Sequence, residues 1–153
     1  MNIRHGLARR LRRGSALAAA LTLCGAGIAV ASNVVKGADY AGTYTGKQGD
    51  SITFKVSANG KRVTDLTAST PFKCQGGCGG VSNGTGGTAA IKDGKFKATL
   101  DLRGPGGSTK VVGTDKVTGT FEKNGEAKGT VTSHFNSGSA GETVHWTAVS
   151  GAQ

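Results

Sequence analysis

Apolar and polar side chains alternate one by one along most of the chain, and this alternation constrains the fold more than any other feature of the sequence. It is clearest in Ser51–Ser57 and Lys95–Leu102, and it recurs over 116–121, 126–133 and 142–149. A period of two residues is typical of a strand with one buried and one solvated face, whereas an amphipathic helix needs a period of about 3.6 residues. The sequence therefore predicts an all-β domain.

The residues between these runs predict how the strands are connected. Asn59-Gly60, Asp93-Gly94 and Asn124-Gly125 each separate two strand-like segments. Asn or Asp followed by Gly supplies the positive φ angles of a tight turn, so we expect antiparallel hairpins. The predicted pairs are 51–57 with 62–70, 88–92 with 95–102, and 116–122 with 126–133.

Further strands are expected at 40–46, at 109–114 and at the C-terminus, which gives about eight to ten short strands in all. Two architectures accommodate them, an antiparallel β-sandwich and a small closed barrel. Many inward positions hold Ala or Gly, and the chain contains a single Trp. These small residues favour a thin, well-filled core over a hollow one, and both architectures remain open.

The first 31 residues have the parts of a secretory signal peptide. Arginines from Arg4 to Arg13 precede an uncharged apolar run over 15–31, which closes with the cleavable Ala29-Val30-Ala31. We therefore expect a secreted, extracellular protein with a Sec-type signal rather than a twin-arginine one. The alternative is a transmembrane anchor, but the apolar run is at the lower length limit of a transmembrane helix. Since cleavage would remove this run, no membrane span is expected in the mature chain. A lipid anchor at Cys24 is disfavoured because Leu23 is not a small residue.

Cleavage changes both the domain organisation and the charge. We expect a signal peptide over 1–31, a short linker over 32–37 and a single β domain over 38–153. Of the 19 Lys and Arg residues five leave with the signal peptide, so the remaining 14 stand against nine Asp and Glu, a net charge of +5. Nucleic-acid binding needs a basic patch or stripe, and the linear order shows no basic run longer than Lys61-Arg62. The expected partners are therefore anionic cell-envelope polymers or polysaccharide, not a specific nucleic acid.

Two cysteines, Cys74 and Cys78, remain after cleavage. Outside the cell an even number of cysteines predicts a disulfide, and two glycines between them let the chain turn back far enough to form it. The redox alternative needs a C-x-x-C motif at a helix start, and the zinc alternative needs two further ligands. We expect a local disulfide at the start of a Gly-rich loop over 75–87.

No residue set in the sequence has the pattern of a catalytic site. His134 and His145 are the only histidines after the leader, and together with Trp146 they are the candidate ligand contacts. The sequence predicts no strand-to-helix G-x-S-x-G elbow, which positions the serine nucleophile of many hydrolases. The loop 104–110 is Gly-rich, but its Lys follows the Ser and Thr, whereas in a phosphate-binding loop the Lys precedes them. We therefore expect no catalytic residues, cofactor or metal, and a protein that is not an enzyme.

Several segments, taken in order, resemble a known group of proteins. They are AGTYTG, ITFKVSANGKRVTDL, DGKF, GTFEKNGEAKGTV and VHWTA, and they span most of 38–149. The chain is similar in this respect to small secreted all-β proteins of actinobacteria whose function is unassigned. In that group the first cysteine is matched by another just before the last strand, where this chain has Ser137–Ala140 instead.

The leading functional expectation is a secreted, non-enzymatic β domain that acts as an extracellular or envelope-associated binding module for an unknown ligand. One alternative is a small-ligand barrel like the lipocalins or avidins, with a hollow interior that reaches Trp146. Another is a secreted hydrolase whose site is not visible in the sequence. Outward threonines on neighbouring strands could bind carbohydrate or ice, although Thr is also common on exposed strands. Loops hold most binding sites on rigid sheets, so 75–87 and 134–142 are the first places to look.

Overall fold

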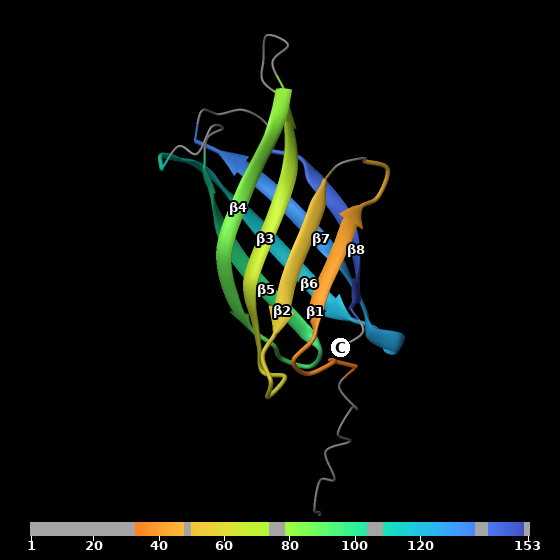
Figure 1. Ribbon diagram of the computed structural model, residues 1–153. Helices are drawn as coiled ribbons and strands as arrows, with labels where there is room; N and C mark the ends of the chain where they lie inside the picture. The colour runs from red at the N-terminus through yellow and green to blue at the C-terminus, as the bar shows by residue number, and fades with distance from the viewer. Residues whose placement is uncertain (1–32, 48–49, 74–78, 104–108, 137–140, 152–153) are drawn as a thin grey trace, which may run out of the picture.

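The chain forms an eight-stranded antiparallel barrel in which each strand pairs with the next and the last strand closes onto the first (Figure 1). The computed structural model describes residues 33–47, 50–73, 79–103, 109–136 and 141–151. The strands are β1 (Asp39–Tyr44), β2 (Ser51–Val56), β3 (Arg62–Lys73), β4 (Gly79–Ala90), β5 (Lys95–Arg103), β6 (Val111–Phe121), β7 (Glu126–Phe135) and β8 (Thr143–Ser150), with a short 3-10 turn η1 (Lys123–Gly125) between β6 and β7. No helix among the described residues is long and apolar enough to cross a bilayer.

The pairing of β1 with β8 decides between the two predicted architectures. Tyr40 to Tyr44 align with Ser150 to Trp146 in an antiparallel ladder, so the sheet closes on itself. The all-β prediction is confirmed, and the β-sandwich alternative is wrong because a sandwich would leave these two strands in separate or open sheets. The predicted N-terminal signal segment lies outside the described residues.

The predicted hairpin turns are present. Asp93 and Gly94 have φ angles of 49° and 69°, and Asn124 and Gly125 have 64° and 74°. In the Asn59-Gly60 turn only Gly60 has a positive φ, 72°, and the Asn59 side chain instead accepts hydrogen bonds from the Ser57 hydroxyl at 2.8 Å and from a backbone N–H at 3.0 Å. Positive φ is what Asn-Gly and Asp-Gly were expected to supply, and it lets the chain reverse between successive strands.

The Gly-rich segment expected to be a loop is a strand wherever the structure describes it. β4 begins at Gly79 and ends at Ala90, so most of the predicted loop 75–87 pairs with β3. Gly84 and Gly87 face the interior, where a Cβ at either position would collide with the Leu100 side chain. These glycines make room for a neighbouring leucine, which is a recognised role of glycine inside a strand.

The two ends of the barrel differ in how their connections are built. We call the end where β1, β3, β5 and β7 finish the loop end, and the opposite end the turn end. The turn end contains the tight turns at 57–61, 91–94 and 122–125. In Figure 1 the loop end is at the top, and the C-terminus leaves from the turn end.

Aromatic side chains fill the interior nearer the turn end. The Tyr40 and Phe54 rings stack with centroids 4.8 Å apart, and Phe54 lies 5.4 Å from Phe96 and 5.9 Å from Trp146. Phe121 completes the cluster at 5.8 Å from Phe96. Rings at these distances and tilts contribute packing energy beyond the area they bury. This half of the barrel therefore has the solid core that the sequence predicts.

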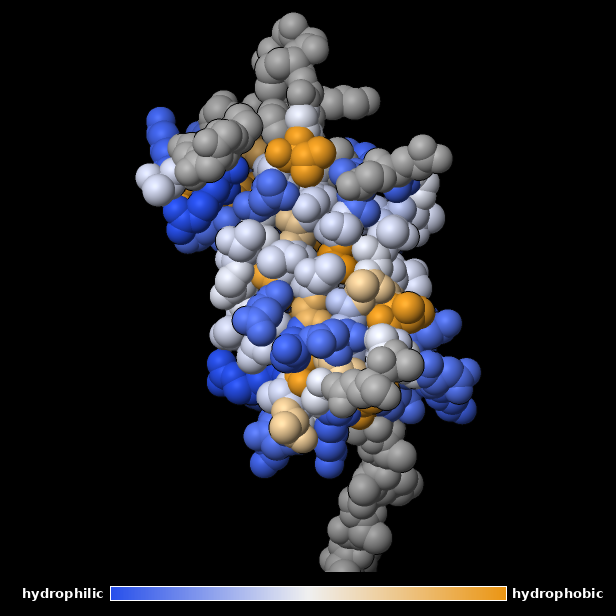
Figure 2. Space-filling model, in the orientation of Figure 1, coloured by the Kyte–Doolittle hydropathy of each residue, from blue (hydrophilic) through white to orange (hydrophobic). Residues whose placement is uncertain are grey.

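The outer surface is polar, as the alternation requires. Figure 2 shows the face over β1 to β4, on which hydrophilic and neutral residues surround isolated hydrophobic ones. Among the side chains that the structure describes, which leave out those of residues 71–73, the exposed large hydrophobic ones are four valines, Val35, Val81, Val111 and Val149. Scattered single residues of this kind are normal on soluble proteins.

Candidate functional site at the loop end of the barrel

The interior nearer the loop end is polar, in contrast to the aromatic half. Strand alternation places hydroxyl and carboxyl side chains inward just before or after the connections of that end. The buried members are Tyr44, Asp50, Thr70, Ser82, Asp115 and Ser133, which come from β1, the approach to β2, and β3, β4, β6 and β7. We call this set the polar cluster. Its residues are distant in sequence and meet only because the barrel closes.

Asp115 is at the centre of the polar cluster and is fully buried. The Thr70 hydroxyl donates to Asp115 Oδ2 at 2.9 Å, and the Ser133 hydroxyl donates to Asp115 Oδ1 at 2.6 Å. Ser133 is the register partner of Asp115 on the adjacent strand, whereas Thr70 lies three strands away across the interior. Each carboxyl oxygen is therefore held from a different side of the barrel.

Burial raises the pKa of Asp115 because a carboxylate loses the hydration that stabilises its charge. The hydroxyls of Ser133 and Thr70 oppose this increase by donating to the charged form, and His134 opposes it weakly through its charge. A carboxylate can accept about four hydrogen bonds, and the two hydroxyls occupy half of that capacity. Asp115 is therefore a buried acid with acceptor capacity in reserve.

Tyr44 brings a second titratable group to the same place. Burial raises its pKa, the neighbouring Thr70 hydroxyl lowers it, and the negative charges of Asp115 and Asp50 raise it further. The Tyr44 hydroxyl lies beside that of Thr70 but has no hydrogen-bond partner of good geometry among the described residues. A buried polar atom without a partner costs about 1–3 kcal/mol, so its position calls for an explanation.

Ser82 connects the polar cluster to the backbone of β3 by a hydrogen bond. Its hydroxyl donates to the Thr70 carbonyl oxygen at 3.2 Å, which links β4 to β3 beside the Thr70 side chain. The hydroxyl hydrogens of Ser82, Thr70 and Ser133 are thus all directed at protein acceptors. These three residues therefore offer only lone pairs to another molecule, whereas the Tyr44 hydroxyl can also donate its hydrogen.

No protein-family model, curated protein or solved structure matches the chain. The resemblance to small secreted actinobacterial proteins therefore stays a prediction. The geometry of the polar cluster and of the barrel surface is the basis for assigning a function.

The side chains of the candidate ligand contacts lie on different faces of the barrel wall. Trp146 is buried among the rings of the aromatic half, whereas His145 precedes it on β8 and is exposed on the outer face. His134 is also exposed, on β7. The register pairs His145 with Thr130, four residues before His134 along β7, which corresponds to about 13 Å between the two histidines.

Other predicted features fall partly or wholly outside the described residues. Cys74 and Cys78 do so, and their disulfide stays a prediction, as do residues 137–140 of the second predicted loop. Within the described ranges, no group of three or more His, Cys, Asp or Glu side chains is arranged to hold a metal ion.

The signal for the polar cluster in the sequence is strand alternation rather than a motif. Asp115 is in phase with Val117 and Phe121, both of which face inward. Ser133 is likewise in phase with the buried Val131, and Thr70 with Ala68. Extending each alternating run toward the loop end would have placed these polar residues inside the domain.

Proposed function

We propose that this chain is a non-enzymatic binding protein whose barrel takes a small polar ligand at its loop end. The observation that supports this proposal is the fully buried Asp115, held across the interior by Thr70 and Ser133. Ligand sites of small barrels commonly lie at the mouth, with few polar groups that fix the orientation of the ligand. This function combines two expectations from the sequence, a non-enzymatic binding module and a barrel that binds a small ligand.

The hydrogen-bonding capacity of the polar cluster indicates the ligand class. Thr70, Ser82 and Ser133 already use their hydrogens, so their oxygens can only accept, and Asp115 also accepts when it is ionised. The complementary ligand is rich in N–H donors, such as a small amine, amidine or urea. A cationic donor would also compensate the charge that burial makes unfavourable on Asp115.

The arrangement of the serines supports binding rather than catalysis. A serine nucleophile needs a base within hydrogen-bond reach to take its proton. Ser82 donates to a backbone carbonyl, which cannot take a proton, and the described histidines His134 and His145 are on the outer face. Ser133 donates to the carboxyl group of Asp115, which also accepts from Thr70, so the described residues of the cluster contain no serine–histidine pair. This arrangement of oriented acceptors supports a recognition site.

The experiment that tests this proposal is a screen of small amines, amidines and ureas against the exported protein, with sugars and fatty acids as comparison compounds. Binding is measured by calorimetry on the wild type, on D115N and on D101N, in which an exposed outward carboxylate is changed instead. We expect N–H-rich compounds to bind the wild type and D101N and to bind D115N at least about tenfold more weakly, a difference of 1.4 kcal/mol. Equal binding to D115N, or binding of apolar compounds only, would contradict the proposal.

The proposal includes a site of action outside the cell, after removal of residues 1–31. The mass of the exported chain tests this part separately. A first residue of Ser32 is expected from the Ala29-Val30-Ala31 motif. A chain that retains the leader, or that carries a lipid on Cys24, would contradict it without affecting the barrel site.

A further inference from the structure

The outer face of β5, β6, β7 and β8 carries a regular array of threonine and lysine side chains. Strand register aligns them in rows that run across the strands. The first row is Lys95, Thr120, Lys128, Thr147 and Thr43, the second is Lys97, Thr118, Thr130, His145 and Thr45, and the third is Thr99, Lys116, Thr132 and Thr143. We call these residues the threonine–lysine face. None of its members is acidic.

The positive charges of this face are close enough to act together. Lys95 and Lys97 are about 7 Å apart along β5, and Lys116 is diagonal to Lys97 at about 7–8 Å. Both separations are within one Debye length at physiological salt, about 8 Å. Lys95, Lys97 and Lys116 form no salt bridge with any described residue, whereas Lys128 is paired with Glu122 at 2.9 Å. The folded sheet thus gathers a basic patch that the linear sequence scatters.

Four of the nine threonines on this face form two hydrogen-bonded pairs that leave hydrogen-bonding capacity open. The Thr118 and Thr130 hydroxyls are 2.8 Å apart, and those of Thr132 and Thr143 are 2.9 Å apart. In each pair one hydroxyl donates to the other, so the second keeps its hydrogen and both keep a lone pair. These pairs can donate to and accept from a ligand that is itself rich in hydroxyl groups.

A shallow groove of about 350 Å³ lies within the threonine–lysine face. Four threonines line it, together with Lys128 and His145, and Gly129 and Trp146 contribute to its floor. The threonines are Thr45, Thr120, Thr130 and Thr147. Hydroxyl groups and the Lys128 ammonium group therefore line the same hollow, and Lys95 and Lys97 continue its rows on β5.

We propose that the threonine–lysine face binds an acidic polysaccharide laid across the strands from β5 to β1. The rows extend over about 19 Å of the curved surface, since neighbouring strands are about 4.8 Å apart. Sugar hydroxyls match the threonine pairs, and the anionic groups of the polymer match the unpaired lysines. This surface is separate from the interior cluster, and the proposal does not depend on the ligand of the loop end.

A nucleic acid fits the same face less well. Sequence-tolerant binding to single strands uses aromatic side chains on which bases stack, and phosphate recognition favours the planar fork of arginine. The rows contain neither arginine nor an exposed aromatic side chain, because Trp146 is buried. Binding by lysine and hydroxyl groups alone is expected to be weak, dependent on ionic strength and selective for hydroxyl-rich polyanions.

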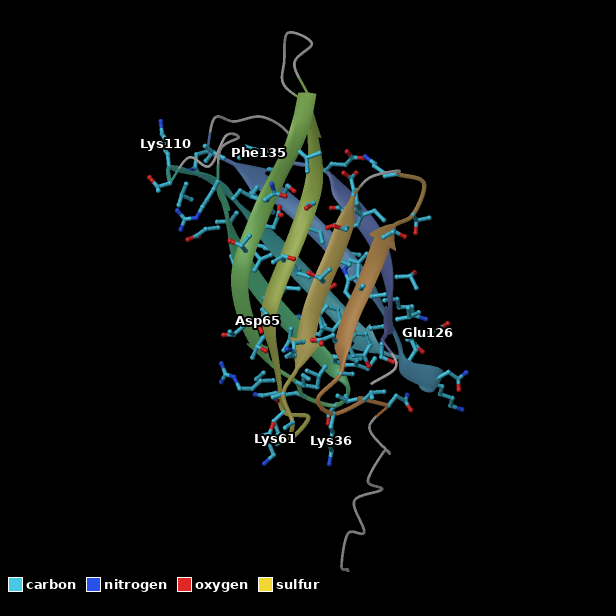
Figure 3. The ribbon with its side chains drawn as sticks, viewed as in Figure 1. Lys36, Lys61, Asp65, Lys110, Glu126 and Phe135 are labelled. Carbon is cyan, nitrogen blue, oxygen red and sulfur yellow. The ribbon has the colours of Figure 1, made fainter. Side chains whose placement is uncertain are left out.

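The test compares polygalacturonate, neutral dextran and double-stranded DNA by affinity electrophoresis of the exported protein at low and high salt. Variant K95Q/K97Q/K116Q removes the unpaired lysines of the face. Its control K36Q/K55Q/K61Q removes the same charge elsewhere, from β2 and from the turn end, where Figure 3 shows Lys36 and Lys61 projecting side by side. Variant T118V/T130V removes one hydroxyl pair without changing the charge.

We expect polygalacturonate, but not dextran, to retard the wild type, and high salt to abolish the effect. The face variant should bind about tenfold more weakly, the control within about twofold of the wild type, and T118V/T130V about threefold more weakly. Equal losses in the two lysine variants would show a dependence on net charge alone and would overturn the proposal. It would also be overturned by unchanged binding in T118V/T130V, or by DNA binding as tightly as polygalacturonate.

Discussion

Thr70 on β3 donates a hydrogen bond of 2.9 Å to Asp115 on β6, across an interior that separates the two strands by two others. A bond of this kind holds opposite walls of the barrel together where the core is polar rather than aromatic. It also stabilises the ionised form of the Asp115 carboxyl group, which burial destabilises. The stability of the loop end and the ligand recognition proposed for it therefore depend on the same side chains.

The first prediction concerns this bond. Replacement T70V keeps the shape of the side chain but removes the donor to Asp115, which leaves a buried acceptor less well satisfied. We expect a loss of about 1–3 kcal/mol in the free energy of unfolding, measured with urea. The control T64V changes a half-buried threonine of the same strand whose hydroxyl has no partner among the described residues, and it should cost less than about 0.5 kcal/mol. Equal losses in both variants would contradict the role given to the bond.

The second prediction is a pH dependence that Asp115 introduces. The folded chain raises its pKa above the unfolded value, so between the two values the folded state binds more protons than the unfolded state. The stability that the protonated group contributes is full below about pH 3.9 and is lost as the pH rises through the folded pKa.

Variant D115N remains neutral and should lack this loss. The difference in unfolding free energy between D115N and the wild type should therefore shift in favour of the variant as the pH rises from about 3.5 to 8. The contributions of the other carboxyl groups cancel in this difference if they do not interact with Asp115. A difference that stays constant with pH, or shifts in the opposite direction, would contradict the raised pKa.

The local part of the fold could be predicted from the sequence, and the global part could not. Alternation and the Asn-Gly and Asp-Gly turns locate the strands because side-chain direction and turn angles are set by neighbouring residues. Barrel closure depends on a ladder between β1 and β8, about a hundred residues apart, for which no local pattern exists. The sandwich alternative could therefore not be excluded before the structure.

Two kinds of residue lie where the sequence pattern did not predict them, for identifiable physical reasons. Gly84 and Gly87 indicated a loop by composition, although they are inward positions left empty for Leu100. Asp115 and Thr70 are polar and were not expected inside, because the hydroxyl donors that make burial of Asp115 tolerable come from strands distant in sequence. Partners of this kind become visible only when the strands are assembled.

The third prediction concerns a shift in the pairing register of β3. Asp65 has a φ of 51°, unusual for a residue with a side chain, and it lies where the pairing of β3 shifts register between Val63 and Leu66 (Figure 3). Asp and Asn tolerate this left-handed conformation better than branched residues do. We expect D65N to be neutral within about 0.5 kcal/mol, and D65V to lose about 1–2 kcal/mol of unfolding free energy in urea. Similar stability of the two variants would show that the positive φ at this position does not depend on residue type.

The fourth prediction tests why β4 contains so many glycines. A Cβ at Gly87 would overlap Leu100 Cδ2, so G87A should force the leucine out of its rotamer and cost about 1–3 kcal/mol. L100A alone should cost about 2–5 kcal/mol because it opens a cavity in the core. In the double variant the added methyl group occupies part of the space that the leucine vacated. Its total cost should therefore be smaller than the sum of the two single costs by about 0.5–3 kcal/mol. Additive losses in urea unfolding would mean that Gly87 does not make room for Leu100, and that the glycine has another role in this strand.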